Sequence, residues 1–214
     1  MEKGRRIENL TRLERELRDK GYKLVAGVDE AGRGPLAGPV IAAACILPAT
    51  FNLPDLDDSK KLTEKKRACL AELIKKQAVA YSVASASHLE IDRLNILNAS
   101  KLAMKRALAG LAVAPDYALI DGRDKLDISL AHQAVIGGDR LCACIAAASI
   151  LAKVTRDNLM CELHKLYPAY NFDRHKGYPT KSHFEALEKF GPCPLHRRSF
   201  SPVKEMVAEQ EELA

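Results

Sequence analysis

The stretch that decides the fold runs from residue 22 to residue 47, YKLVAGVDEAGRGPLAGPVIAAACIL. Residues 22–28 are apolar and β-prone, and glycines follow closely, so they predict a strand that ends before Asp29 and Glu30. Residues 40–47 form a second apolar run soon afterwards in the chain. The two segments together predict a β-hairpin.

Helical patterns and further short strands alternate along the rest of the chain. Residues 141–166 carry the longest helical pattern, whose alanines leave little bulk and let a helix lie close to a sheet. Residues 191–214 are expected to be irregular, with 205–213 either frayed or adding a last helical turn. Strands that begin as a hairpin and later alternate with helices predict an α/β fold, a mixed β-sheet flanked by helices on both faces. The other predicted helices cover residues 5–20, 64–76 (capped by Thr63), 98–111 and 180–190, and the other predicted strands cover residues 78–86 and 117–120.

The chain length of 214 residues fits one domain with a small addition. From residue 167 the chain becomes rich in tyrosine, histidine and proline. We therefore expect a main domain over residues 1–166, including the N-terminal helix at 5–20, and a small helical C-terminal subdomain over residues 167–214.

The composition is typical of a globular protein, since 47% of the residues are hydrophobic and 29% are charged, and it argues against disorder. The N-terminal residues show no secretory signal, and no apolar run is long enough to span a membrane. We therefore expect a cytoplasmic protein. The formal charge of +5 permits a polyanionic partner without requiring one.

The six cysteines are scattered along the chain and are expected to be reduced thiols. Cys142 and Cys144 are separated by one residue and have no Cys or His partner at the spacing of a zinc site. We therefore expect this pair to be structural.

Four acids stand where predicted elements begin or end. Asp29 and Glu30 follow one strand, Asp121 follows another, and Asp139 precedes the long helix. Carboxylates without accompanying Cys or His suit hard cations such as Mg²⁺ or Mn²⁺. Two such ions can support an in-line displacement at phosphorus, so the pattern favours phosphodiester hydrolysis. Because successive strand residues point to opposite faces, Asp29 and Glu30 are expected to share one site only if the chain leaves strand geometry there.

Each of these residues also fits a simpler role. Asp139 fits a helix cap, Asp121 fits an Asp-Gly turn, and Asp29-Glu30 fits the start of a solvated loop. Lys153 and Asp157 are four residues apart on the long helix, where a plain ion pair explains them as well as a catalytic role does. Spacing alone leaves these alternatives open.

Two segments fit contact with nucleic acid. Gly32-Arg33-Gly34 allows the backbone to approach a sugar-phosphate chain and bind a phosphate or a 2′-hydroxyl through its N–H groups, although an ordinary loop fits as well. A cationic and aromatic cluster at residues 174–183, joined by 196–198 and by Lys60-Lys61, fits either contact with a duplex backbone or an idle surface loop.

Several motifs resemble those of the type 2 ribonuclease H family. The first is the unbroken run GVDEAGRGPLAGPV at residues 27–40. The last, HRRSFSPV at residues 196–203, resembles the bacterial branch, and the similarity spans residues 22–203. Between them stand DSKKL at 58–62, DG at 121–122, GD at 138–139, IAAASILAKVTRD at 145–157 and HKGY at 175–178.

The resemblance implies a ribonuclease H-like fold and an endonuclease that hydrolyses the RNA strand of RNA/DNA hybrids and incises duplex DNA 5′ of single ribonucleotides. It implies two divalent ions, Mg²⁺ or Mn²⁺, and products with 5′-phosphate and 3′-hydroxyl ends. The metal-binding catalytic acids would be Asp29, Glu30, Asp121 and Asp139. Substrate would be contacted by Gly32, Arg33, Gly34, Ser59, Lys60, Ser149, Lys153, Tyr178 and Arg197, of which the Gly32–Gly34 loop and Tyr178 would sense the ribose at the RNA–DNA junction.

The chain departs from the family pattern at three positions. Gly137 stands where lysine is expected, and Cys142 and Cys144 stand where serines are expected, which puts backbone contacts there in doubt. Two alternatives remain: a type 3 ribonuclease H, which would carry an extra N-terminal domain, and a catalytically silent hybrid-binding module. The expected partners are RNA/DNA hybrids and ribonucleotide-containing duplex DNA, with the protein a monomer that needs no protein partner.

Overall fold

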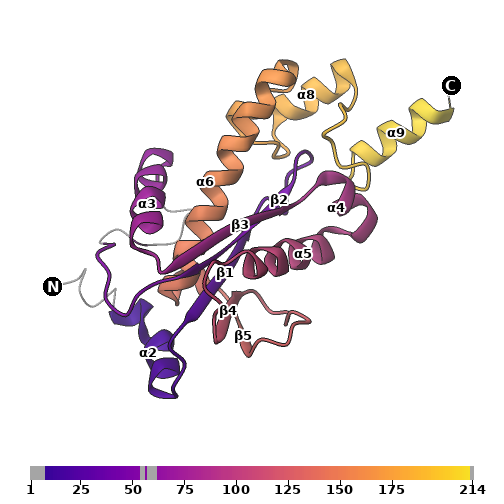
Figure 1. Ribbon diagram of the computed structural model, residues 1–214. Coiled ribbons are helices and arrows are strands. Elements are labelled where there is room, and N and C mark those ends of the chain that lie inside the picture. Colours follow the sequence, from indigo (N-terminus) through magenta and orange to yellow (C-terminus); the bar gives the residue numbers. More distant parts are fainter. Residues whose placement is uncertain (1–7, 54–55, 57–61, 213–214) are drawn as a thin grey trace.

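The computed structural model describes residues 8–53, 56 and 62–212 (Figure 1). The strands form one five-stranded sheet in the order β3-β2-β1-β4-β5, and helices lie on both of its faces, as the sequence pattern predicted. The strands are β1 (Val25–Ala31), β2 (Val40–Ile46), β3 (Ala80–Ala86), β4 (Tyr117–Asp121) and β5 (His132–Val135). The helices are α2 (Arg12–Asp19), α3 (Glu64–Gln77), α4 (His88–Leu94), α5 (Ile96–Ala109), η2 (Gly138–Arg140), α6 (Ala143–Leu166), η3 (Pro168–Tyr170), α7 (Phe172–His175), α8 (Lys181–Phe190) and α9 (Val203–Glu212).

The first two strands form the predicted hairpin. Strands β1 and β2 pair in antiparallel fashion, and β3 also pairs in antiparallel fashion with β2. On the other side of β1, strands β4 and β5 pair in parallel. The sheet is therefore mixed, which confirms the predicted fold class.

Strand β1 runs further than the sequence indicated. The expectation that it ends before Asp29 is wrong, because pairing with β2 keeps the chain extended as far as Ala31. On the other side, β4 accompanies β1 only as far as Val28, which pairs with Ile120. Among the described strands, the last three residues of β1 therefore have a neighbour on one side only.

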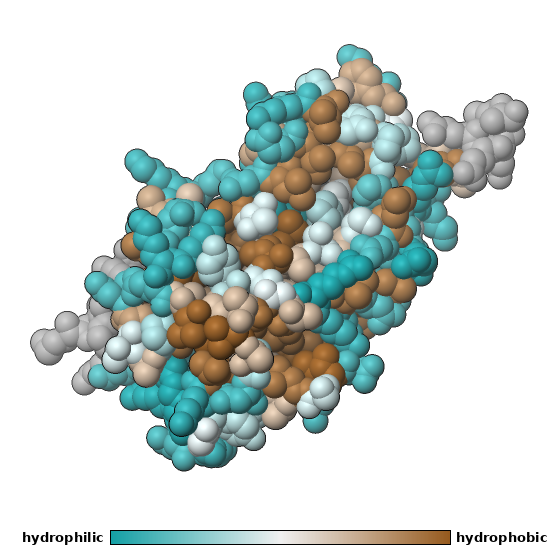
Figure 2. Space-filling view, in the orientation of Figure 1, coloured by the Kyte–Doolittle hydropathy of each residue, from teal (hydrophilic) through white to brown (hydrophobic). Residues whose placement is uncertain are grey.

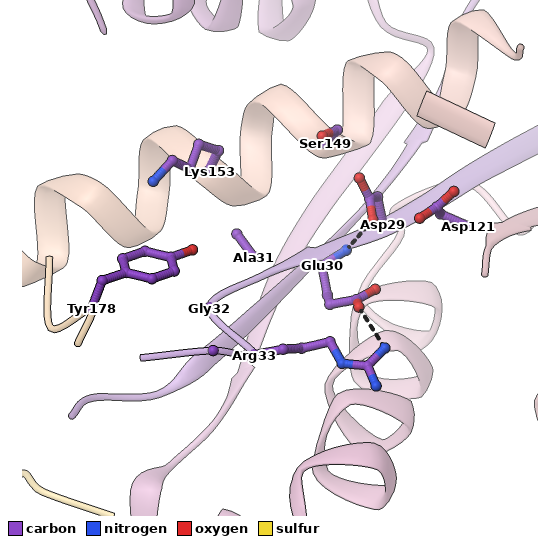
Figure 3. Close-up of a pocket in the computed structure, with 10 residues that line it drawn as sticks. Asp29, Glu30, Ala31, Gly32, Arg33, Asp121, Ser149, Lys153 and Tyr178 are labelled. Carbon is purple, nitrogen blue, oxygen red and sulfur yellow. Dashed lines mark hydrogen bonds and ion pairs between the residues drawn. The ribbon is translucent and has the colours of Figure 1, made fainter. Parts of the chain in front are cut away.

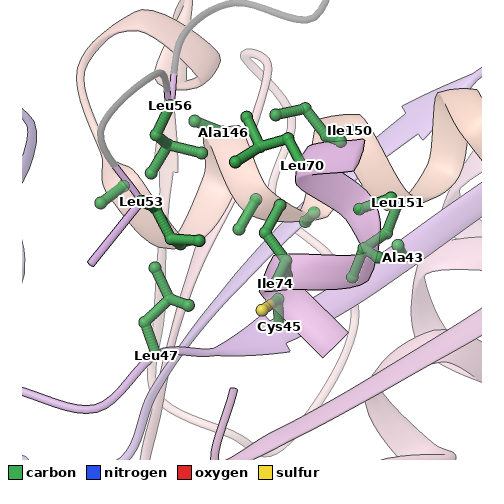
Figure 4. Close-up of a cluster of buried hydrophobic side chains, with 14 of the residues drawn as sticks. Ala43, Cys45, Leu47, Leu53, Leu56, Leu70, Ile74, Ala146, Ile150 and Leu151 are labelled. Carbon is green, nitrogen blue, oxygen red and sulfur yellow. The ribbon is translucent and has the colours of Figure 1, made fainter. Parts of the chain in front are cut away.

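The hydrophobic core has two halves, one on each face of the sheet. Ile41, Ala43 and Cys45 of β2 pack with α3 and α6, whereas Ala42 and Ala44 pack with α5 on the other face. Figure 4 shows the first half, where leucines and isoleucines of α3 and α6 close over the small residues of β2. Because β2 is buried on both faces, its sequence is continuously apolar instead of alternating.

Helix α6 lies very close to β1 at Gly27. A Cβ atom added to Gly27 would lie 2.0 Å from the carbonyl carbon of Cys144, in the first turn of the helix. Glu14 of α2 is only 3% exposed, and its Oε1 accepts a hydrogen bond from the N–H of Cys144 at 2.9 Å. A glycine on the strand and a carboxylate at the helix N-terminus thus fix where α6 crosses the sheet.

The six cysteines are free, as predicted. Cys142 and Cys144 are buried at the start of α6, and burial raises the pKa of both thiols. They are therefore protonated core side chains, in agreement with the structural role expected for them.

Most of the other predicted elements agree with the structure within a few residues. Thr63 caps α3 as predicted, since its hydroxyl accepts a hydrogen bond from the N–H of Lys66 at 3.3 Å. The helix predicted at 5–20 is present from residue 8 with a turn at Thr11, and residues 5–7 lie outside the described part. Strand β5 was not predicted; it is four residues long and lies at the edge of the sheet.

The chain beyond α6 packs as a helical cluster against the end of that helix. Leu36 and Ala37, from the glycine-rich loop, share a buried cluster with Met160 of α6 and Phe172 of α7. The expectation of an irregular C-terminal tail is wrong in part, because α9 forms a helix of 10 residues. The division predicted after residue 166 coincides with the end of α6, and the separation into two units stays a prediction.

The face of the molecule drawn in Figure 2 carries both hydrophobic and hydrophilic side chains. Figure 2 shows hydrophobic residues gathered across the middle of this face and hydrophilic residues around them. Among the helices of the described chain, none is both long and apolar enough to cross a membrane.

We predict that Gly27→Ala destabilises the protein strongly. The added methyl group would overlap the backbone of Cys144, which cannot retreat without a shift of α6. We expect the free energy of unfolding to fall by about 3 kcal/mol or more, at the upper end of the usual cost of overpacking. Urea unfolding followed by circular dichroism measures this loss.

Gly21→Ala is the matched control, because no atom of the described residues lies within 4 Å of a Cβ added there. The φ of +98° at Gly21 is expected to cost alanine about 1–2 kcal/mol. A loss for Gly27→Ala no larger than that for Gly21→Ala would contradict the close packing of α6 on β1.

Candidate active site

A cleft of about 240 Å³ opens where β1 and β4 end and α6 passes beside them (Figure 3). All of its lining residues except Ala31 were candidate site residues from the sequence. The lining consists of Asp29, Glu30, Ala31, Gly32, Arg33, Gly34, Asp121, Ser149, Lys153 and Tyr178.

Three of the four predicted acids line this cleft, namely Asp29, Glu30 and Asp121. Figure 3 shows the carboxylate of Asp29 beside that of Asp121, whereas Glu30 points toward Arg33. The expectation that the chain must leave strand geometry here is wrong, since both residues of β1 reach the cleft from a regular strand. The reason is that β1 has no β4 partner beyond Val28, so both side chains can bend around its unpaired edge.

Neighbouring carboxylates oppose the ionisation of Asp29 and of Glu30. Burial raises the pKa of Asp29 well above its usual value, and the charges of Glu30 and Asp121 raise it further, although a hydrogen bond from the Ser149 hydroxyl lowers it. Burial also raises the pKa of Glu30, although Arg33, whose Nη1 lies 3.3 Å from Oε1, acts in the opposite direction. An added cation would therefore favour the ionised forms of Asp29 and Glu30.

The donor atoms of the cleft suit a hard divalent cation. They are carboxylate oxygens, and the lining contains no cysteine or histidine. Lys153 does not neutralise them, because its Nζ lies 2.7 Å from Oδ1 of Asp157. Among the described residues, no group of three or more His, Cys, Asp or Glu side chains is arranged so that it could hold a metal ion. The carboxylate oxygens that line the cleft are nevertheless the type of ligand that Mg²⁺ and Mn²⁺ prefer, and these ions keep several water ligands.

Asp139 does not line the cleft, although the turn that contains it touches one of the cleft acids. It is 6% exposed and belongs to the 3₁₀ turn η2. The preceding residue, Gly138, donates its N–H to Oδ1 of Asp121 at 2.7 Å, so this turn contacts one of the cleft acids. The alternative that Asp139 caps the long helix is wrong, because the N-cap of α6 is Cys142. The convergence of all four acids stays a prediction.

The two glycines of the loop are glycine for different reasons. A Cβ on Gly32 would lie 2.0 Å from Nε of Arg156, a buried side chain beneath the loop. A Cβ on Gly34 would meet, among the described residues, the Tyr178 ring alone, at an ordinary contact distance of 3.7 Å. The fold therefore requires glycine at position 32, whereas the space beside Gly34 is open to a ligand.

Tyr178 and Lys153 lie at the end of the cleft away from Asp121 (Figure 3). The Lys153 Nζ is 5.6 Å from the centre of the Tyr178 ring, within the range of a cation–π contact. Tyr178 is 37% exposed, so its ring and hydroxyl can contact a ligand. The predicted ion pair of Lys153 with Asp157 is present, and Lys153 also reaches the cleft.

Arg197 does not face the cleft. It is fully buried, and its guanidinium donates to the carbonyl oxygens of Gly32, Arg33 and Gly38 at distances from 2.6 to 3.0 Å. The expectation that Arg197 contacts substrate directly is therefore wrong. The other candidates, Ser59-Lys60, lie outside the described residues, so their contacts stay predictions.

Only some residues of the cationic cluster at 174–183 and 196–198 are exposed at the surface. Arg174 is exposed, as contact with a duplex would require. His183 and His196, by contrast, are 0% and 2% exposed. The two histidines therefore belong to the core of the C-terminal segment.

The buried histidines form a neutral pair. Their Nε2 atoms lie 3.0 Å apart, so only one of the two can carry a proton. Nδ1 of His183 lies 3.0 Å from the carbonyl oxygen of Tyr178 and must donate, which leaves its Nε2 as an acceptor. Nδ1 of His196 accepts from the N–H of Cys193 at 2.9 Å, so the proton on Nε2 of His196 is donated to His183.

Because this pair is buried in its neutral form, we predict that the protein loses stability in mild acid. Burial lowers the pKa of His183 and of His196 to about 4, whereas each is about 6.5 in the unfolded chain. At pH values between about 4 and about 6.5, the unfolded chain binds more protons than the folded protein does. The free energy of unfolding therefore falls as the pH drops from about 6.5 to about 4. Each histidine adds a slope of up to about 1.4 kcal/mol per pH unit, measurable by urea unfolding at several pH values.

The control is the double variant His183→Gln with His196→Gln, in which neither amide titrates. Its stability should depend less steeply on pH than that of the parent over the same interval. Equal slopes in the two proteins would show that the histidines are not buried in their neutral form.

Comparison with known proteins identifies the family. The family model Ribonuclease HII matches residues 26–203. Ribonuclease HII of Desulfitobacterium hafniense (strain DSM 10664 / DCB-2) is 58% identical over 202 residues, which cover 94% of this chain and 78% of the relative. Ribonuclease HII of Neisseria meningitidis serogroup B is 58% identical over 188 residues, 87% of this chain and 97% of the relative. The crystal structure of ribonuclease H2 from Pyrococcus horikoshii OT3 has a TM-score of 0.75 at 26% identity, over 88% of this chain and 99% of that chain.

All residues that line the cleft lie inside the segment that the family model matches. The match is to the type 2 enzymes, so the type 3 alternative is set aside, and the relatives are named as nucleases, so the silent binding module is set aside too. The chain belongs to the ribonuclease HII family and is a nuclease of the ribonuclease H class.

Proposed function

We propose that this nuclease incises duplex DNA on the 5′ side of single ribonucleotides and cuts the RNA strand of RNA/DNA hybrids. The products would carry 5′-phosphate and 3′-hydroxyl ends, as expected when water attacks phosphorus. The observation that carries the proposal is the cleft itself, where carboxylates from two strands lie beside a loop with room for a ligand. Such cleavage would serve ribonucleotide excision and the removal of RNA primers.

The proposed metal ligands are Asp29, Glu30 and Asp121, with Asp139 as the fourth acid. Two bound Mg²⁺ or Mn²⁺ ions would supply an activated water and stabilise the leaving oxygen. Mutual repulsion of the carboxylates supports this assignment, because a divalent cation between them removes the repulsion.

Hydrogen bonds within the protein orient these carboxylates in advance. Asp29 accepts from the Ser149 hydroxyl and from the N–H of Glu30, the latter at 2.7 Å. Asp121 accepts from the N–H of Gly138 at 2.7 Å. Such contacts restrict the carboxylate rotamers and reduce the reorganisation that ligand binding requires.

The Gly32–Gly34 loop and Tyr178 are proposed to read the sugar. In the described chain, the N–H groups of Arg33 and Gly34 enter no hydrogen bond with the protein, so they are available to a 2′-hydroxyl. The Tyr178 hydroxyl points into the cleft (Figure 3). A deoxyribose would leave these polar groups without a partner, which is the kind of loss that gives strong discrimination.

We predict that Asp121→Asn loses cleavage while it retains duplex binding. Asparagine keeps the shape and the bond from Gly138 but removes the charge that holds a cation. We expect kcat to fall by about 100-fold or more, the loss typical when one transition-state contact is removed. The assay follows incision of a DNA duplex with one ribonucleotide in Mg²⁺ and in Mn²⁺, and fluorescence anisotropy reports binding.

Asp127→Asn is the matched control, because Asp127 is a fully exposed carboxylate whose Oδ2 lies 3.5 Å from Lys105 Nζ. Its kcat should equal that of the parent. A parent protein that leaves the ribonucleotide duplex intact, or that cuts an all-DNA duplex equally well, would refute the proposed function. Undiminished kcat in Asp121→Asn would refute the metal assignment.

A further inference from the structure

Two arginines lie buried beneath the glycine-rich loop. Arg156 of α6 and Arg197 are both 0% exposed, although arginine is among the residues least often buried. Arg156 donates three hydrogen bonds, to the carbonyl oxygens of Ala37, Pro39 and Lys176, at distances from 3.0 to 3.2 Å. It therefore ties the loop both to α6 and to the segment that carries Tyr178.

Arg197 holds the part of the loop nearest the cleft. Its Nη2, Nη1 and Nε donate to the carbonyl oxygens of Gly32, Arg33 and Gly38 respectively. These carbonyls are thereby turned toward the protein interior. The N–H groups of Arg33 and Gly34 are left without a partner in the described chain, and both residues line the cleft.

The two guanidinium groups are held by carbonyl dipoles rather than by carboxylates. Within the described part of the chain, their hydrogen bonds all go to backbone oxygens. Burial lowers the pKa of Arg156, and burial together with the charge of Arg156 lowers the pKa of Arg197 to about 9. Two neighbouring buried cations are costly to the fold, and apolar side chains of similar volume would avoid that cost.

The fit between loop and arginine is also tight. A Cβ on Gly32 would lie 2.0 Å from Nε of Arg156 and 2.4 Å from its Cδ. The loop therefore rests directly on this side chain. A different side chain at position 156 would therefore shift the backbone at Gly32 directly, because no other side chain lies between them.

We propose that Arg156 and Arg197 are positioning residues that hold the loop of residues 32–39 in the shape that presents its free N–H groups to the substrate sugar. This inference rests on the proposed function and deepens it. Neither arginine touches the substrate; both act through the carbonyl oxygens of the loop. Their planar, forked donors are essential to this action, because a lysine carries the same charge on a single nitrogen.

The test uses Arg156→Lys and Arg197→Lys in the full-length protein. We expect kcat/KM on a duplex with one ribonucleotide to fall by about 100-fold in each, the cost of a small misplacement of binding groups. Hydrogen exchange should become faster in residues 32–39, where the N–H groups of Leu36 and Gly38 are bonded in the parent, and stay unchanged in residues 40–46 of β2. The affinity for Mn²⁺ without nucleic acid should also stay unchanged, since the acids do not move.

Arg12→Lys is the control, because Arg12 is an exposed arginine on α2, paired with Glu16 at 3.4 Å, and it should match the parent in every measurement. Both lysine variants matching the parent in kcat/KM would overturn the inference. Exchange that rises as much in residues 40–46 as in residues 32–39, in both variants, would also overturn it, since the arginines would then hold the whole fold. A parent that cuts no ribonucleotide duplex would refute the proposed function instead, and the exchange data would still report on the loop.

Discussion

The close crossing of α6 over β1 at Gly27 is the contact on which the rest of the structure depends. It places one face of the helix along the strand and the loop that follows. Ser149 then bonds to Asp29, and about two helical turns later Arg156 lies beneath Gly32. A single helix thus orients a cleft acid and supports the loop beside it, because residues seven apart lie on the same face. The small side chains of α6 serve this approach, since bulkier ones would lift the helix off the strand.

The chemistry of the site follows from where strand pairing stops. Beyond Val28 the edge of β1 has no parallel neighbour in the described sheet, and the end of β4 brings Asp121 to that edge. Asp29 and Glu30 can therefore approach Asp121 although they are consecutive in a regular strand. The resulting concentration of negative charge is unfavourable by itself, and a hard cation is the partner that such oxygens suit.

The sequence predicted the hairpin, the mixed sheet and the long helix correctly, because these depend on local hydrophobic patterns and on alanine content. It could not predict how far β1 extends, since that depends on pairing with β2 rather than on the residues of β1. The burial of Arg156 and Arg197 was missed for a related reason. Their acceptors are backbone carbonyls up to 165 positions away, and no side-chain pattern marks them. Nine of the residues that line the cleft were nevertheless predicted. The family motifs indicate which residues belong to the site, although they do not show how these residues are arranged in space.

Binding of Mn²⁺ to the protein in the absence of nucleic acid tests most directly the claim that the acids at the open edge of β1 hold divalent cations. Electron paramagnetic resonance of the free ion gives the number of bound ions and their affinity. The account predicts binding by the parent protein and its loss in Asp29→Asn, because the Asp29 carboxylate interacts electrostatically with both Glu30 and Asp121. Undiminished Mn²⁺ binding by Asp29→Asn would contradict it.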